Sequence, residues 1–143
     1  MKAEYLKIRQ NNPHIPASQA LEYVRDLITI SELESRFEIE LTVMPEDLPL
    51  RGNLICSGDN RYDRKLENET IDRLESGDVW AWCIVEVRLI TRCKCCGSVK
   101  DSFSDFLGGC SYAGPSEFKA GGYYLDMIKT VIAASGVDYS MGP

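Results

Sequence analysis

Apolar and polar residues alternate most clearly over residues 79–90, and this alternation predicts a strand. One face of that strand would be apolar throughout, because it carries Val79, Ala81, Cys83, Val85, Val87 and Leu89. The opposite face begins with Trp80 and Trp82 and becomes polar at Glu86. An entirely apolar face beside a half-polar one is typical of a central strand that is fully covered on one side. We therefore predict that residues 79–90 form the centre of a sheet.

Two further segments are predicted to be strands. Residues 37–43 alternate apolar side chains with acidic or hydroxyl ones, the pattern of a half-buried strand, and Pro45 ends the alternation. After a loop over residues 92–102, residues 103–112 would pair antiparallel with the central strand. Gly108 and Gly109 interrupt this last strand, and glycines inside a strand usually mark a bulge or a close backbone approach.

Apolar residues recur at helical spacing in three segments, residues 19–30 after a capping Ser18, residues 63–75 before Gly77, and residues 123–134 before Gly136. The side chains expected to face inward are Leu21, Val24, Leu27, Ile28, Tyr62, Leu66, Ile71, Leu74, Tyr124, Met127, Ile128 and Val131. About three helices packed on a small antiparallel sheet predict the α+β class.

The chain of 143 residues fits a single domain, since domains typically run to about 100–150 residues. Residues 1–16 are polar and are predicted to be a loose leader. Residues 44–62 form the longest irregular stretch, in which residues 54–56 would make a short strand. A loop of this length inside a compact domain is more often functional or mobile than a plain connection.

Composition narrows the class of partner. The net charge of −6 disfavours nucleic acid, whose affinity comes mostly from clustered Lys and Arg, and leaves a basic protein partner open. No stretch approaches the roughly 18 consecutive apolar residues of a membrane helix. The first residues also lack the apolar core of a signal peptide. We therefore expect a protein of the cytoplasm without a membrane partner.

The six cysteines are expected to be reduced thiols or metal ligands in that compartment. Cys93 and Cys96 form a C-x-x-C-G turn, in which two thiolates can hold zinc. Cys110 would come from the neighbouring strand as a third ligand, with Cys83 or Cys95 as the fourth. One matched pair with additional cysteines leaves two interpretations open, structural zinc and reduced cysteines at a hairpin tip.

The sequence contains no complete catalytic set. The cysteine cluster could act in redox or nucleophilic chemistry, but no histidine is paired with it in the sequence. The only histidine, His14, lies in the predicted leader, which disfavours Cys–His and Ser–His–Asp mechanisms. The sequence therefore favours a protein that binds over one that catalyses.

The long loop holds the polar candidates for binding. Ser57, Asp59 and Asn60 suit either a cation loop or an Asx-type turn in which Asp59 or Asn60 caps the next helix, and we favour the cap. Arg51 and Asn53 flank a glycine, and the arginine could grip an anion or simply belong to a surface turn.

Aromatic residues gather in the C-terminal half of the chain as Trp80, Trp82, Tyr112, Tyr123 and Tyr124. Beside an exposed strand face they could anchor a protein partner or stack on a base. Alternatively, they fill a second, smaller core under the last helix. Gly121 and Gly122 precede that helix and could expose its first amide groups to an anion.

Several of these segments share their order and spacing with one family. They are residues 49–53 (PLRGN), 57–59 (SGD), 77–83 (GDVWAWC), 85–87 (VEV), 107–112 (LGGCSY) and 121–127 (GGYYLDM), with Phe118. Residues 44–134 thereby resemble a family of short uncharacterised proteins of bacteriophages, prophages and plasmids, whose pattern lacks the segment with Cys93, Cys95 and Cys96. The resemblance implies a genomic setting rather than a reaction. Accessory proteins in that setting often bind host enzymes, defence systems or small signalling nucleotides.

The resulting expectation is a non-enzymatic accessory protein of a mobile element. It would occupy a host protein, such as one of a defence system, through the strand face from Trp80 to Glu86. The alternative is a sponge for a small anionic nucleotide, held by Arg51, the loop of residues 57–60 and the amides near Gly121. A structural zinc domain or a cysteine-based enzyme comes third, and a homo-oligomer stays open.

Overall fold

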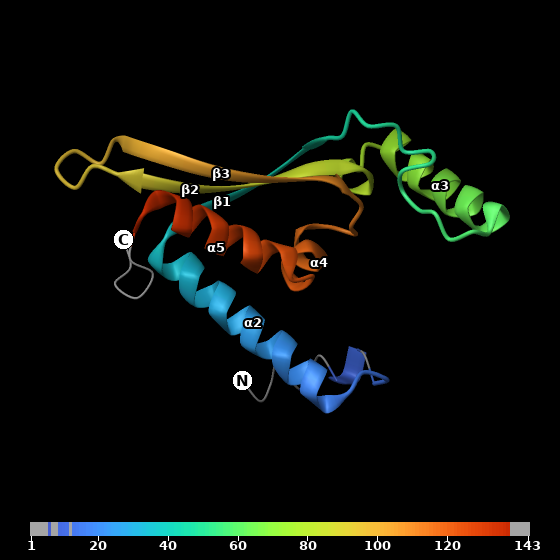
Figure 1. Cartoon of the computed structure of the whole chain (residues 1–143), viewed down its shortest axis with the longest axis horizontal. Coiled ribbons are helices and arrows are strands. Elements are labelled where there is room, and N and C mark those ends of the chain that lie inside the picture. Colours follow the sequence, from blue (N-terminus) through green and yellow to red (C-terminus); the bar gives the residue numbers. More distant parts are fainter. Residues whose placement is uncertain (1–5, 7–8, 12, 138–143) are drawn as a thin grey trace.

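The computed structural model describes residues 6, 9–11 and 13–137 of the chain. Its elements are α2 (Ala17–Arg36), β1 (Glu38–Pro45), α3 (Asn60–Glu75), the 3₁₀ turn η1 (Val79–Ala81), β2 (Cys83–Arg92), β3 (Val99–Cys110), α4 (Pro115–Ala120) and α5 (Tyr123–Ser135). The strands form an antiparallel sheet in the order β1-β2-β3 (Figure 1), which confirms the predicted α+β class.

One face of the sheet carries the core, and we call it the inner face. Its residues from β1, β2 and β3 are Ile39, Leu41, Val43, Val85, Val87, Leu89, Phe103 and Leu107. Helix α5 lies against this face, and α2 and α4 pack beside α5 (Figure 1). Val85 and Val87 are fully buried, and Leu89 nearly so. The predicted central strand therefore occupies the centre of the sheet, with its apolar face inward.

The first residues predicted for the central strand form a 3₁₀ turn instead. The Asp78 carboxylate accepts a hydrogen bond of 3.1 Å from the backbone N–H of Trp80, and η1 spans Val79–Ala81. Strand β2 begins only at Cys83. An aspartate that satisfies a nearby N–H competes with a strand for the same backbone, which alternation alone does not reveal. The predicted start at residue 79 was therefore wrong.

The β2–β3 hairpin is tighter than expected. Strand β3 begins at Val99, so the loop covers only residues 93–98 instead of 92–102. At the other end, Cys83 pairs with Cys110 and Val85 pairs with Leu107, which leaves two residues of β3 opposite one of β2. The extra residue is accommodated by Gly109, whose φ is +64°. This is the predicted bulge.

The last helix agrees with the prediction, whereas the first differs in extent. Helix α5 buries its apolar face, and Gly136 ends it in the left-handed conformation with φ of +72°. Helix α2 begins at Ala17 without a side-chain cap, so Ser18 lies inside it. Leu21, expected to face inward, is 38% exposed. The short helix α4 was not predicted.

The N-terminal part also departs from the prediction. Of the leader predicted over residues 1–16, residues 1–5, 7–8 and 12 lie outside the described part of the chain, and residues 9–11 are helical. Within the long loop, residues 54–56 form no strand. None of the described helices is long and apolar enough to cross a lipid bilayer.

Helix α3 stands beyond one end of the sheet (Figure 1). Its main contact with the body is with η1. Its most buried residues are polar, Glu67 and Thr70, while Tyr62, expected to face inward, is 52% exposed. The predicted helix is therefore present, but polar contacts rather than an apolar core hold it in place.

Removing a buried side chain from β2 should destabilise the whole domain. Leu89→Ala is expected to lower the free energy of unfolding by about 2–5 kcal/mol, because it leaves a cavity under α5. The matched change Leu48→Ala, at a residue that is 46% exposed, should stay within about 0.5 kcal/mol of wild type. Urea unfolding followed by circular dichroism measures both, and equal losses would contradict the assignment of the core.

Candidate functional site

The face of the sheet turned away from the helices, here called the outer face, lacks a cover of described helices (Figure 1). The strand register places on it Glu38, Glu40, Thr42, Met44, Ile84, Glu86, Arg88, Ile90, Ser102, Ser104 and Phe106. Phe106 lies directly opposite Glu86 and is 57% exposed. Sequence reasoning missed Phe106. The alternation of β3 could have indicated it, because Phe103 and Leu107 point to one face of the strand and Phe106 points to the other.

Glu86, a predicted binding residue, lies at the centre of the outer face and is only 7% exposed. Ser104 Oγ donates a hydrogen bond of 2.7 Å to Glu86 Oε2, and Arg88 Nη2 donates one of 3.2 Å to the same oxygen. A buried carboxylate needs such partners, because an unpaired charge there is costly. Glu86 therefore links β3 and Arg88 of β2 through its hydrogen bonds, and it offers little surface to a partner.

The aromatic residues divide between the core and the surface. Trp80 and Tyr112 pack on Phe118 with ring centroids 6.0 and 5.2 Å apart, and burial raises the pKa of Tyr112. These rings therefore join the one core cluster found in the described residues and do not form the separate, smaller core that was expected as the alternative. Trp82 is 3% exposed, and its Nε1 donates a 2.6 Å hydrogen bond to the carbonyl of Leu48. Of the predicted aromatic binding residues, Tyr123 is the exposed one, at 54%.

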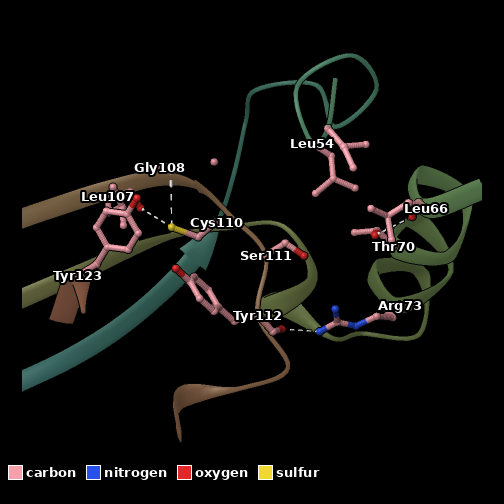
Figure 2. Close-up of a pocket in the computed structure, with 12 residues that line it drawn as sticks. Leu54, Leu66, Thr70, Arg73, Leu107, Gly108, Cys110, Ser111, Tyr112 and Tyr123 are labelled. Carbon is pink, nitrogen blue, oxygen red and sulfur yellow. Dashed lines mark hydrogen bonds between the residues drawn. The ribbon is translucent and has the colours of Figure 1, made fainter. Parts of the chain in front are cut away.

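A cavity of about 520 Å³ lies between α3, the long loop and the end of β3 (Figure 2), and we call it the end cavity. Arg73 is its charged side chain. It pairs with Asp78 at 2.8 Å and donates a 2.6 Å hydrogen bond to the carbonyl of Tyr112. These contacts hold α3 to the rest of the domain, and they leave the Arg73 guanidinium paired with a carboxylate. Tyr112 and Tyr123 both line the end cavity, so it brings two of the predicted binding residues together.

Arg51 and Asn53 fasten the long loop. Arg51 Nη2 donates a 2.9 Å hydrogen bond to Asn68, and Arg51 Nη1 lies 3.7 Å from Glu67. Glu67 also accepts a 2.7 Å hydrogen bond from the backbone N–H of Gly52. Asn53 Nδ2 donates to a carbonyl within the loop, at 2.7 Å. Glu67 is the central residue of this arrangement, and sequence reasoning missed it because it is one acid among many on a charged helix.

Asp59 is the N-cap of α3, in agreement with the helix cap that the sequence favoured over a cation loop. Its side chain accepts hydrogen bonds of 3.1 and 3.2 Å from the backbone N–H groups of Arg61 and Tyr62. Asn60 is the first residue of the helix. Ser57 Oγ donates to Asp63, whose carboxylate also accepts from the Ser57 N–H at 3.2 Å. These oxygens are engaged in turn and cap hydrogen bonds, the arrangement of the Asx-type alternative.

The elements expected to hold an anionic nucleotide do not meet. The guanidinium of Arg51 is engaged with α3, as described above. Gly121 instead lines a second cavity of about 390 Å³, between α2 and the α4–α5 junction, together with Glu117 and Asp26. The arrangement therefore brings Arg51 and the amides near Gly121 to no common cavity among those found in the described residues.

Five of the six cysteines fall into two groups at opposite ends of the β2–β3 hairpin, and Cys56 lies in the long loop. Cys83 and Cys110 are free thiols that lie opposite each other in the strand register at the bulge, and both are buried. Burial raises the pKa of Cys83 to about 12. Cys93, Cys95 and Cys96 lie in the hairpin loop, with their sulfurs within 4.8 Å of one another. Cys110 therefore does not join Cys93 and Cys96, contrary to the predicted ligand set, because the whole length of β3 separates it from them.

In comparisons with models of protein families, with curated proteins and with solved structures, nothing matches this chain.

Loss of the α3 cap should open α3 locally. Asp59→Ala removes two hydrogen bonds to the first turn, and loss of an N-cap costs about 1 kcal/mol. Amide hydrogen exchange in residues 60–75 should therefore become about fivefold faster, with exchange in β2 unchanged. The control Asp72→Ala, at an exposed position within α3, should leave the exchange as in wild type. An equal effect of both variants would contradict the role of the cap.

The exposed Cys56 and the buried Cys83 and Cys110 should differ in reactivity. In the native reduced protein at pH 8, iodoacetamide should modify the exposed Cys56 and leave Cys83 and Cys110 untouched, because the thiolate is the nucleophile. Raising the pH to 10 should still leave Cys83 unmodified, since its pKa of about 12 keeps it protonated. Peptide mass spectrometry measures each site, and all should react in urea. Native modification of Cys83 would contradict its burial.

Proposed function

We propose that this protein is a non-enzymatic binding module that takes a folded protein partner on the outer face of its sheet. The observation that carries the proposal is Phe106, a large aromatic side chain that is 57% exposed on a sheet face without a described helix. Binding energy at protein interfaces concentrates at aromatic residues of this kind.

The surroundings of Phe106 support an interface. Ile84, Met44 and Ile90 are half-buried on the same face, so aliphatic surface extends along the strands. Arg88 and the glutamates of β1 supply charge around it. Apolar surface with charged neighbours is the composition of a protein interface, whose centre is apolar and whose rim is polar. The hydrogen bonds to Glu86 stiffen the centre of this face, which lowers the entropy lost on binding.

The edges of the sheet favour docking on the face over the addition of a partner strand. β1 and β3 are the outer strands of the described sheet. Asp105 of β3 lies on the inner-face side, opposite Val87, where a charge opposes continuation of the sheet. On β1, Glu38 forms a bidentate ion pair with Arg92, at 2.7 and 2.8 Å. Charged edge strands disfavour edge-to-edge pairing, so the partner is a folded surface.

The resemblance of residues 44–134 to proteins of phages and plasmids supports a host protein as the partner, such as one belonging to a defence system. The net charge of −6 supports a partner surface that is basic overall. The chain contains one histidine, His14, which lies exposed ahead of α2, and this supports binding rather than catalysis. The proposal places the protein in the host cytoplasm.

Capture from a lysate of the host cell tests the proposal, with the tagged chain as bait and quantitative mass spectrometry as readout. Wild-type protein should retain one main host protein. Phe106→Ser should reduce its retention by at least tenfold, because loss of an interface hot spot costs about 2 kcal/mol or more. Tyr62→Ser, at an aromatic residue of α3 that is 52% exposed, should retain it as wild type does.

The variant Tyr123→Ser separates the outer face from the end cavity. Loss of the partner with Tyr123→Ser and retention with Phe106→Ser would move the site to the end cavity and overturn the proposal. Equal capture by all variants would also overturn it. Circular dichroism of each variant shows whether it is folded before its capture is compared.

A further inference from the structure

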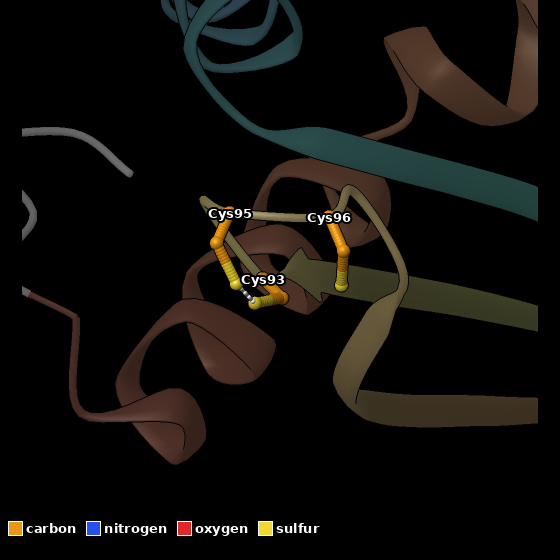
Figure 3. A group of neighbouring side chains, drawn as sticks. All are labelled: Cys93, Cys95 and Cys96. Atoms are coloured by element: carbon orange, nitrogen blue, oxygen red, sulfur yellow. Dashed lines mark hydrogen bonds between the residues drawn. The ribbon is translucent and has the colours of Figure 1, made fainter.

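The hairpin loop between β2 and β3 gathers three cysteine side chains at one point (Figure 3). The sulfurs of Cys93, Cys95 and Cys96 all lie within 4.8 Å of one another, and those of Cys93 and Cys95 are 2.8 Å apart. Cys95 and Cys96 are exposed, and Cys93 is half-buried. No histidine or carboxylate belongs to this group within the described residues, so the donor set is entirely sulfur.

Backbone hydrogen bonds hold the loop that presents these sulfurs. The N–H of Cys93 donates to the carbonyl of Ser98 at 2.8 Å, and the N–H of Gly97 donates to the carbonyl of Cys93 at 2.8 Å. Gly97 has a φ of +74°, which favours glycine at this turn. Arg92 donates to the carbonyl of Gly97 at 3.1 Å and pairs with Glu38 on β1. The cluster therefore sits on a closed turn tied to the sheet.

Hydrogen bonds also engage the sulfurs of this turn. Cys93 and Cys95 share one between their sulfurs, and Cys96 Sγ lies 3.0 Å from Ser98 Oγ. Hydrogen-bond partners of this kind orient the ligands of metal sites.

The spacing suits a small thiophilic cation. A Zn–S bond of about 2.3 Å in a tetrahedron places two sulfurs about 3.8 Å apart. One pair of sulfurs is 2.8 Å apart and all three lie within 4.8 Å of one another, so they are already close to the spacing that one ion requires. Thiolates select zinc and other soft ions over magnesium or calcium.

The chain supplies no fourth ligand from the described residues near this turn. Cys83 and Cys110 are buried at the far end of the hairpin, and Cys56 lies in the long loop before α3. A structural zinc site is closed by four protein ligands, whereas a site with three keeps one position for another group. The exposure of Cys95 and Cys96 leaves that position facing solvent.

We propose that Cys93, Cys95 and Cys96 bind one zinc ion through three thiolates, with the fourth position open to an exogenous ligand. This site is independent of the outer face proposed above to bind a protein partner. It differs from the set expected from the sequence, because Cys110 is not part of it and Cys95, one of the two candidates for a fourth ligand, is the third.

Titration of the metal-free, reduced full-length chain with Co²⁺ under argon tests this site, since cobalt reports thiolate ligands by its charge-transfer absorption. Wild type should bind one cobalt per chain, and Zn²⁺ should displace it. Each of Cys93→Ser, Cys95→Ser and Cys96→Ser should weaken binding by more than about 100-fold, because even loss of an outer hydrogen-bond partner costs about 10–100-fold. Cys56→Ser, the matched change at an exposed cysteine outside the cluster, should bind as wild type does.

Imidazole added to the cobalt complex tests the open position and should shift the visible bands of wild type. Absence of a charge-transfer band, or unchanged affinity in Cys95→Ser, would overturn the three-thiolate site. Half a metal per chain with formation of a dimer would assign the fourth ligand to a second copy and overturn the open position, as would visible bands that do not respond to imidazole. Capture of the protein partner by the Cys93→Ser variant is measured in parallel. It reports on the outer face alone, so a failure of the zinc site is distinguished from a failure of the outer-face proposal.

Discussion

Burial of the inner face of β2 is the interaction on which the rest of the structure depends. Val85 and Val87 lose all of their exposure beneath α5, and their neighbours on β1 and β3 extend the same apolar layer. Burial of such side chains stabilises a fold by about 1.5–3 kcal/mol each, so this layer sets the register of the whole sheet. Because the inner face is used for packing, it is not available to a partner.

Different physics governs the end of the molecule that carries α3. There, Arg73 links α3 to Asp78 and to the carbonyl of Tyr112, and Glu67 links it to the turn of Arg51. Polar contacts of partly exposed groups contribute less than apolar burial, because water competes for them. The α3 end should therefore open more readily than the sheet. The end cavity lies between the two, so its α3 side is less stable against local unfolding than its β3 side.

The outer face and the cysteine turn occupy the same hairpin but use separate features. Phe106 belongs to the paired part of β3, whereas Cys93, Cys95 and Cys96 belong to the loop beyond it. The hydrogen bonds of the loop join Cys93, Gly97 and Ser98, whereas Phe106 pairs with Glu86 in the ladder, so the two features share no residue. A protein partner and a metal ion would thus be bound by independent parts of one hairpin, and each site can be altered without the other.

The sequence by itself determined features that depend on near neighbours in the chain: the alternation of β1 and the apolar face of α5. It also predicted a cap of α3 by Asp59 or Asn60 and a bulge or close approach at Gly108 and Gly109, and the structure selected Asp59 and the bulge. Each of these follows from residues only a few positions apart, whose spacing and backbone preferences are local. Only the tertiary structure decided that Trp80 packs on Phe118, that Glu67 receives the turn of Arg51, and that Cys110 lies far from Cys93. These outcomes depend on how distant segments meet after the core forms, and a pattern along the chain carries no information about that distance.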